Sequence, residues 1–405
     1  MSIVLYEPVC CGLEHAVVNA ALATAVLAAY PGERVDFWGE CEHLAGVREV
    51  LGVAGGAAVE WRSIAIPSRR LKEQERLAPE YRLVAEVLRA ARECRARMLI
   101  ACGVSIAGLA ALKTHLLLHA VRFPVVALHH SALQTIMQSR STRALLAWGN
   151  SRSLTHVVFS ENIRRSLLQK LPTLADSVVS AQLPYIFPAM TTHAHGSEEA
   201  VRFGFLGVGS ERKGFRKFCE LARRVKAGRD DHGRSVEFEL VGSLGAEFRN
   251  AADSQMLVDK KNGLIVNVAA TDGILPRELY VERLARIDYA VFLHEATEYT
   301  YVASGALLDA FARLIPCIAV RDPFFEGYFE AMGDIGYLCE DIDHMDALIL
   351  DIATSRPVER YRMQQDSIRR GRRIFEPQAF AAVLHRIAGR GAPCRASSVS
   401  PNAYR

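Results

Sequence analysis

The chain has 405 residues, of which 50% are hydrophobic and 23% are charged, and its formal net charge is +4. This composition is typical of a folded globular protein and excludes a disordered or collagen-like chain. The length exceeds that of one ordinary domain, so we expect two domains, each with its own core. The longest apolar stretch, residues 16–30, contains Asn19 and Thr24 and is too short for a membrane-spanning helix.

The first residues and the cysteines indicate a cytoplasmic protein. Met1 precedes an apolar run that lacks a basic region and a small-residue cleavage site, so we expect no secretory signal. The nine cysteines form no CxxC pair, and Cys10, Cys102 and Cys317 lie in apolar runs, where thiols behave as small hydrophobic groups. Such cysteines fit a reducing compartment.

One part of the N-terminal half carries charge of a single sign. No acidic residue occurs between Glu93 and Glu161, whereas this stretch contains seven basic residues, Arg95, Arg97, Lys113, Arg122, Arg140, Arg143 and Arg152. A basic surface attracts anionic acceptors or anionic lipid. The arginines are not interleaved with stacking aromatic residues, so we do not expect a nucleic-acid partner. Contact with the inner face of the cytoplasmic membrane is therefore an expectation for this half.

Taken in chain order, the first half alternates strands and helices. Strand-like apolar runs occupy 3–9, 35–39, 59–67, 98–104, 125–131 and 156–160, and helical patterns occupy 13–29, 73–95, 135–147 and 162–171 among others. This alternation is typical of βαβ units with a parallel sheet covered on both faces. We expect a Rossmann-like N-terminal domain over residues 1–185, followed by a Pro-containing linker over 186–200.

The alternation then restarts. Strand-like runs at 201–208, 236–242, 264–268, 289–294, 316–320 and 336–340 are separated by helical segments, including 215–227, 276–286 and 304–313. We expect a second Rossmann-like domain over 201–356, two further helices over 357–389 that return to the N-terminal domain, and a disordered tail over 390–405. The fold class is α/β, with two doubly wound domains facing a cleft in which ligands bind.

A glycine-rich turn opens the second domain. Gly207, Gly209 and Ser210 follow a strand, and Arg212, Lys213 and Gly214 lead into a helix. Backbone amides at such a turn bind phosphate and a lysine adds positive charge. The third glycine of a dinucleotide fingerprint falls on Arg212, so this is not a dinucleotide-binding motif.

A second segment of the same domain also favours ligand binding. Ser304 and Gly305 start a helix whose first amides would face a ligand. Asp309 lies one and a half turns later, where its carboxylate could accept hydrogen bonds from a ribose diol. A structural carboxylate near the positive end of the helix is the alternative.

These motifs resemble those of GT-B glycosyltransferases, and the C-terminal half is similar to glycosyltransferase family four. Gly207, Lys213 and Gly214 match the family's glycine turn ending in Lys-Gly. The second half of its E-x7-E-A-x-A-x-G-x-P-V-I-A segment is matched by Asp309, Ala310, Ala312, Pro316, Ile318 and Ala319, and its N-terminal acceptor-side turn by Gly12, Leu13, Glu14 and His15. The resemblance implies a nucleoside-diphosphate sugar as donor, a glycan or lipid-linked sugar as acceptor, and no essential metal or other cofactor.

The chain departs from this family at two charged positions. Val208 stands where the family has a phosphate-binding Arg, which Arg212 could replace, and Tyr301 stands where it has the first Glu. Glu295 and Glu298 are the nearby carboxylates that could approach the sugar instead.

For acid–base catalysis the candidates are His15, His129 and His130, with Glu14 beside the first. The leading hypothesis is sugar transfer in the synthesis of a bacterial surface polysaccharide or glycoconjugate. A nucleotide-sugar epimerase of the same architecture and a catalytically degenerate binding or scaffold subunit are the alternatives.

Overall fold

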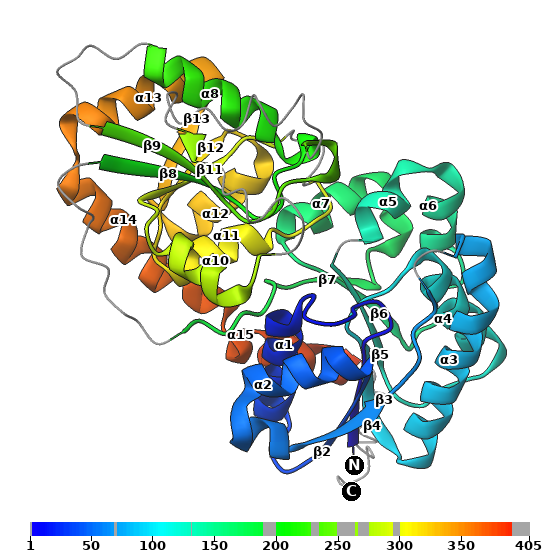
Figure 1. Cartoon of the computed structure of the whole chain (residues 1–405). Helices are drawn as coiled ribbons and strands as arrows, with labels where there is room; N and C mark the ends of the chain where they lie inside the picture. Colours follow the sequence, from blue (N-terminus) through cyan, green and yellow to red (C-terminus); the bar gives the residue numbers. More distant parts are fainter. Residues whose placement is uncertain are drawn as a thin grey trace, which may run out of the picture.

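The computed structural model describes residues 2–68, 71–130, 132–188, 200–227, 235–248, 264–265, 275–294 and 300–390. The chain forms two parallel sheets, each flanked by helices (Figure 1). The predicted α/β class with two Rossmann-like, doubly wound domains is confirmed. The predicted tail beyond residue 390, the linker residues 189–199, and Glu295 and Glu298 lie outside the described residues.

The N-terminal sheet has seven parallel strands in the order β3-β2-β1-β4-β5-β6-β7. Its strands are β1 (Ser2–Tyr6), β2 (Arg34–Gly39), β3 (Val59–Ser63), β4 (Ala96–Ala101), β5 (Val125–His129), β6 (Leu154–Val158) and β7 (Val178–Ser180). Every residue of β1 and β5 is buried, as expected for strands covered by helices on both faces. The strand order reverses at β1, whose neighbours are β2 and β4. In open α/β sheets such a switch point is where ligands bind.

The helices of this domain are α1 (Ala16–Ala29), α2 (Cys41–Ala57), α3 (Glu73–Glu93), α4 (Ile106–Leu118), α5 (Ala132–Gln138), α6 (Arg140–Ala147) and α7 (Glu161–Lys170). Two differ from the sequence-based expectation. The first helix begins at Ala16 and not at residue 13, because Gly12 and His15 have φ of 54° and 51° and form a left-handed turn. The segment expected as one helix over 135–147 is broken at Ser139, whose hydroxyl caps α6 by accepting a hydrogen bond from the Thr142 amide.

The C-terminal sheet has six parallel strands in the order β10-β9-β8-β11-β12-β13. They are β8 (Ala200–Leu206), β9 (Ser235–Val241), β10 (Leu264–Ile265), β11 (Tyr289–Phe292), β12 (Cys317–Val320) and β13 (Gly336–Cys339). Helices α8 (Phe215–Ala227), α10 (Arg277–Leu284), α11 (Gly305–Ala312), α12 (Pro323–Met332) and α13 (Ile342–Ser355) accompany them. None of the helices in the described ranges combines the length and apolar character that crossing a membrane requires.

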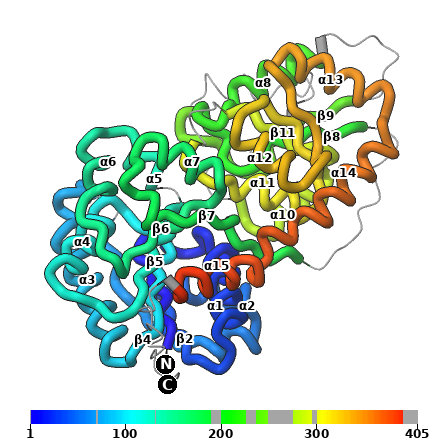
Figure 2. Tube along the Cα trace, turned by 180° about the vertical axis from the view of Figure 1, so that it is seen from behind, coloured from blue at the N-terminus to red at the C-terminus, as the bar shows by residue number. Residues whose placement is uncertain are grey.

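The chain connects the two domains twice. Residues 181–188 lead from β7 towards the second domain, and α14 (Val358–Gly371) is followed by α15 (Pro377–Arg390), which lies beside α1 of the first domain (Figure 2). The Tyr30 hydroxyl donates a hydrogen bond to the Leu384 carbonyl over 3.3 Å. The two connections meet where the Tyr185 amide donates to the Phe375 carbonyl over 2.8 Å. The last helix therefore belongs to the N-terminal core.

Candidate active site

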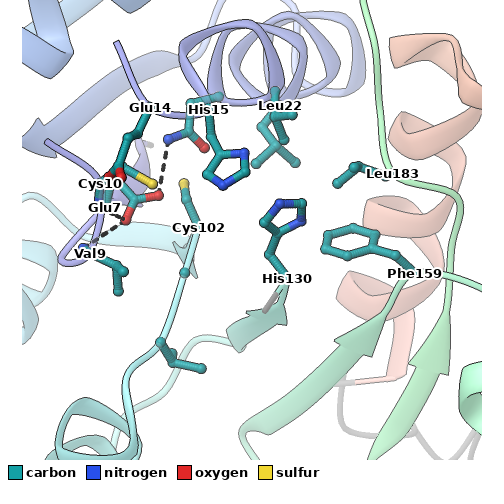
Figure 3. Close-up of a pocket in the computed structure, with 14 residues that line it drawn as sticks. Glu7, Val9, Cys10, Glu14, His15, Leu22, Cys102, His130, Phe159 and Leu183 are labelled. Atoms are coloured by element: carbon teal, nitrogen blue, oxygen red, sulfur yellow. Dashed lines mark hydrogen bonds between the residues drawn. The ribbon is translucent and has the colours of Figure 1, made fainter. Parts of the chain in front are cut away.

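A cavity of about 210 Å³ lies at the carboxyl ends of the N-terminal strands, next to the switch point between β1 and β4. Its polar side chains include Glu7, Glu14, His15, Asn19 and His130, and Figure 3 shows Glu7, His15 and His130 around the same space. The remaining lining is apolar, cysteine or glycine. The cavity therefore combines a few polar groups with apolar walls, as small-molecule sites do.

His15 and His130 form an aromatic pair in this cavity. Their ring centroids are 4.2 Å apart and the rings cross at 81°. Burial, with a smaller contribution from His15, lowers the pKa of His130 to about 3, so this ring stays neutral at physiological pH. His15 lies on the exposed left-handed turn before α1. Because a base with a very low pKa is inefficient near neutral pH, His15 is the better placed of the two for proton transfer.

A buried network that the sequence reasoning missed lies beneath this turn. Glu7 Oε1 accepts hydrogen bonds from the amides of Val9 (2.8 Å) and Cys10 (3.0 Å), and Glu7 Oε2 accepts one from Asn19 Nδ2 (3.0 Å). Asn19 Nδ2 also lies 2.8 Å from His43 Nε2. Since an amide nitrogen only donates, His43 Nε2 accepts and the proton is assigned to Nδ1.

His43 Nδ1 lies 3.0 Å from the Gly12 carbonyl and donates to it. The network thus joins β1, α1 and α2 to the turn that carries Glu14 and His15. Glu7 directly follows the first buried strand, at the switch point, and that position was the sequence signal which could have identified it. Nothing in the local sequence singled out Asn19 or His43, since both lie within helices.

His129 is not part of the cavity, which corrects its predicted catalytic role. It is the last residue of β5, so its side chain points away from the face that His130 occupies. His129 Nε2 lies 2.9 Å from His156 Nδ1, and both side chains are buried. Burial, and to a smaller extent the charge of Lys113, lowers the pKa of His129 to about 4. The pair is structural.

Lys113 is not part of the expected basic surface, which corrects the sequence-based prediction for this residue. The side chain is fully buried, and Nζ donates to the carbonyls of Leu146 and Trp148 and to Asn150 Oδ1 over 2.6 to 2.7 Å. Burial lowers the pKa of this ammonium group to about 8. Lys113 therefore holds α4 to the end of α6.

The glycine turn of the second domain is built differently from the expected amide cradle. The amides of Gly207 and Gly209 donate to the carbonyls of Val241 and Ser243 over 2.8 Å each, which extends the pairing of β8 with β9. These two amides are therefore used by the sheet and do not supply phosphate donors. Gly207 and Gly214 have φ of 87° and 80°, a backbone conformation that favours glycine.

Lys213 lies over this turn, and its Nζ is 3.4 Å from the position that a Cβ at Gly207 would occupy. Burial lowers the pKa of Lys213, with a contribution from Arg212 in the same direction, while Asp309 opposes the shift. A side chain at Gly207 would crowd the ammonium group. The glycine thus leaves room for the cation, which stays close to the end of β8.

Asp309 has partners that the ribose hypothesis did not anticipate. Its carboxylate accepts hydrogen bonds from the hydroxyls of Tyr185 (2.6 Å) and Tyr280 (3.0 Å), and Arg277 lies 3.6 Å away. Tyr185 belongs to the connection between the domains. In this structure Asp309 anchors that connection to α11, and its contact with a ribose diol stays a prediction.

The remaining candidates from the sequence lie at the start of α11 or at the glycine turn. Ser304 caps this helix by accepting a hydrogen bond from the Leu307 amide over 3.3 Å, and Gly305 is its first residue. The Tyr301 side chain is buried and its amide donates to Gln134 Oε1 of α5 over 3.2 Å, which joins the two domains. Ser210 is the N-cap of the short 3-10 helix Glu211–Lys213, and Arg212 lies within that helix.

Comparison with known proteins finds no matching family model and no match among curated protein sequences. Solved structures match over nearly the whole chain. The apo lipopolysaccharide outer core galactosyltransferase WaaB has a TM-score of 0.61 at 12% identity, over 95% of this chain and 99% of its own. Anabaena HepE in complex with UDP has a TM-score of 0.64 at 13% identity, over 96% of this chain and 100% of its own.

A third structure, of an E. coli trehalose-6-phosphate protein bound with UDP-2-fluoro glucose, has a TM-score of 0.61 at 11% identity, over 96% of this chain and 99% of its own. Identities this low relate the folds and not the activities. This likeness over nearly the whole of each chain, together with the two parallel sheets, shows that this chain has the GT-B fold.

Proposed function

We propose that this protein is a glycosyltransferase that moves a sugar from a nucleoside-diphosphate sugar to an acceptor seated in the N-terminal cavity. The observation that carries the proposal is the cavity itself, in which His15, His130 and Glu7 gather at the switch point of the first Rossmann-like sheet. Its support is the likeness, over nearly the full length, to solved structures that contain UDP or a UDP-sugar.

In the proposed reaction His15 accepts the proton of the attacking acceptor hydroxyl, since it lies at the mouth of the cavity on the exposed turn. Neutral His130 orients the acceptor by hydrogen bonding. Lys213 stabilises the charge that develops on the departing diphosphate. We propose no resident cofactor and no essential metal, so activity should persist in EDTA.

The network of Glu7, Asn19 and His43 acts through the turn and not on the substrate. By fixing the Gly12 carbonyl it limits where His15 can lie, and preorganised groups are more effective than mobile ones. The acceptor would be a glycan or a lipid-linked sugar, used in the synthesis of a bacterial surface polysaccharide or glycoconjugate. Arg122, Arg140 and Arg152, which are exposed, would favour contact with an anionic membrane.

Calorimetry with UDP, GDP and their sugars tests the donor assignment. We expect one nucleotide to bind to the wild type and Lys213→Ala to weaken its binding at least tenfold, because a partly buried ammonium group beside the diphosphate would be lost. Arg223→Ala, on the exposed side of α8, is the matched control and should bind as the wild type does. Absence of nucleotide binding by the wild type would contradict the proposal.

A non-catalytic nucleotide-binding subunit is the second candidate. Val208 and Tyr301 replace two charged family positions, and Asp309 is held by tyrosine hydroxyls. Binding of a nucleotide sugar without transfer, hydrolysis or epimerisation across a broad acceptor panel would favour this candidate over the enzyme.

A further inference from the structure

The charged side chains that line the N-terminal cavity are acidic. Glu7 and Glu14 line it, and within the described part of the chain no Lys or Arg does. The seven basic residues between Glu93 and Glu161, from which an anionic acceptor was expected, all lie outside this lining. The Lys, Arg, Asp and Glu side chains of the lining are therefore opposite in sign to the charge that the local sequence suggests.

His130, the buried one of the two histidines that line the cavity, does not offset this charge. His130 is neutral at physiological pH because burial lowers its pKa to about 3. Its Nδ1 is buried and finds no hydrogen-bond partner among the described residues. A neutral imidazole supplies a hydrogen bond to a ligand but no positive charge to hold a carboxylate or phosphate.

Glu7 is also able to receive a ligand. Its two oxygens offer about four acceptor positions, and the structure uses three of them, for Val9, Cys10 and Asn19. Gly103 lies against the carboxylate, since a Cβ there would be 3.2 Å from Oε1 and 3.5 Å from Oε2. The missing side chain keeps space beside Glu7, which suits one additional donor from a ligand.

We infer that the cavity seats an acceptor terminus which donates hydrogen bonds through hydroxyl or amino groups and carries no carboxylate or phosphate. This inference rests on the proposed function, because it takes the cavity as the acceptor site. The volume of about 210 Å³ is below the range of roughly 300–1,000 Å³ that is usual for drug-sized ligands. One terminal sugar residue fits that size, and any anionic part of a longer acceptor lies outside.

A matched series of methyl glycosides tests the inference. The probes are methyl glucoside, its 2-amino-2-deoxy analogue and methyl glucuronide, with the nucleotide sugar that binds in calorimetry as donor and nucleotide release as the signal. We expect kcat/KM for the glucuronide to be at least tenfold below that for the glucoside. We expect kcat/KM for the amino sugar to equal or exceed that for the glucoside, because its ammonium group would face two carboxylates.

Two variants assign the effect to the cavity. Glu14→Gln, at the exposed rim, should reduce the ratio of kcat/KM for the glucoside to kcat/KM for the glucuronide at least threefold. Glu49→Gln, which changes an exposed carboxylate on α2 outside the lining, should leave this ratio unchanged. Gly103→Ala should lower kcat/KM for both the glucoside and the amino sugar, because the new methyl group occupies the space beside Glu7. Equal use of the glucuronide by the wild type, or a ratio unaffected by Glu14→Gln, would overturn the inference.

A binding measurement separates failure of this inference from failure of the proposed function. Imidazole resonances of His15 and His130 are followed by NMR while each glycoside is added without nucleotide. If the wild type releases no nucleotide with any acceptor, the proposed function fails. The binding of the glycosides then tests the inference about the cavity by itself. Shifts with the amino sugar and not with the glucuronide then support the inference. Equal or tighter binding of the glucuronide, or no binding of any probe, contradicts it.

Discussion

The side-chain amide of Asn19 donates hydrogen bonds to both Glu7 and His43, over 3.0 and 2.8 Å. All three side chains are almost completely buried. A single amide group in α1 thereby satisfies a carboxylate at the end of β1 and an imidazole in α2. Buried polar groups that are hydrogen-bonded cost little, whereas the same groups left without partners cost much.

Replacing this amide should destabilise the N-terminal domain. Asn19→Leu keeps the approximate volume but leaves the Glu7 carboxylate and His43 Nε2 without their donor, so we expect the free energy of unfolding to fall by about 2–4 kcal/mol. Urea unfolding followed by circular dichroism measures it. Thr24→Val on the same helix removes only a hydrogen bond to the Ala20 carbonyl and should cost less than about 1 kcal/mol. Equal losses for both variants would contradict a role for the network.

His43 should matter for the turn that carries His15. His43→Leu removes the imidazole that donates a hydrogen bond to the Gly12 carbonyl, and we expect kcat to fall at least tenfold. Nucleotide affinity should stay unchanged, because the residues proposed to bind the nucleotide sugar lie in the other domain. His43→Gln can still donate and accept, and should restore part of the activity. Alkylation of Cys10, which is buried in the wild type, provides a reading independent of activity. It should be faster in His43→Leu than in His43→Gln.

Gly214 should tolerate no side chain. A Cβ there would lie 2.2 Å from the Leu293 carbonyl oxygen, and its φ of 80° disfavours other residues, so Gly214→Ala should destabilise the C-terminal domain by roughly 3 kcal/mol or more. Gly305→Ala is the matched control, because nothing lies within 4 Å of its Cβ position. In the first turn of α11 that change should be neutral or stabilise by up to about 1 kcal/mol. Thermal unfolding of both variants distinguishes the two outcomes.

The contact between Tyr185 and Asp309 predicts how the connection between domains behaves. Tyr185→Phe removes one of the hydrogen bonds to the Asp309 carboxylate and should cost about 1–2 kcal/mol of stability, while Asp309→Ala removes the shared acceptor and should cost more. Since Asp309 is held as an anchor, Tyr185→Phe should change nucleotide affinity by less than twofold. A large gain in affinity would instead indicate that the released carboxylate takes up the ribose.

The buried histidines should make the N-terminal domain sensitive to acid. Burial lowers the pKa of His129 to about 4, of His130 to about 3 and of His156 below its usual value. Near neutral pH folded and unfolded states are both neutral at these sites. As pH falls below about 6.5 the unfolded chain binds protons that the folded one does not, so stability falls until the folded pKa values are reached.

Between pH 6 and 5 the free energy of unfolding should fall by about 1 kcal/mol per pH unit for each independent histidine. His129 and His156 are hydrogen-bonded to each other and titrate as a coupled pair, so their joint slope is the quantity to compare. Urea midpoints at pH 7.5, 6 and 5 measure the effect. His130→Phe should flatten the dependence, and Thr24→Val should not. A stability that is constant over this range would contradict the burial of these rings as neutral groups.

The sequence by itself determined the two Rossmann-like domains of this protein, because apolar runs covered on both faces and helices of ten or more residues recur along the chain, and that periodicity is local. The same local signals placed His15 and His130 at strand and helix ends. They could not tell which way His129 points relative to His130, or that Lys113 is buried, because both depend on which elements pack against that segment.

Only the tertiary structure decided the composition of the cavity and the role of Asp309. Glu7, Asn19 and His43 come from three elements that parallel pairing and helix packing bring together, and their chemistry exists only as a network. The sequence did not reveal that Tyr185, 124 positions before Asp309, donates a hydrogen bond to its carboxylate. The sign of the charged lining was likewise a property of the packing, since none of the seven basic residues of that stretch lines the cavity and two carboxylates do.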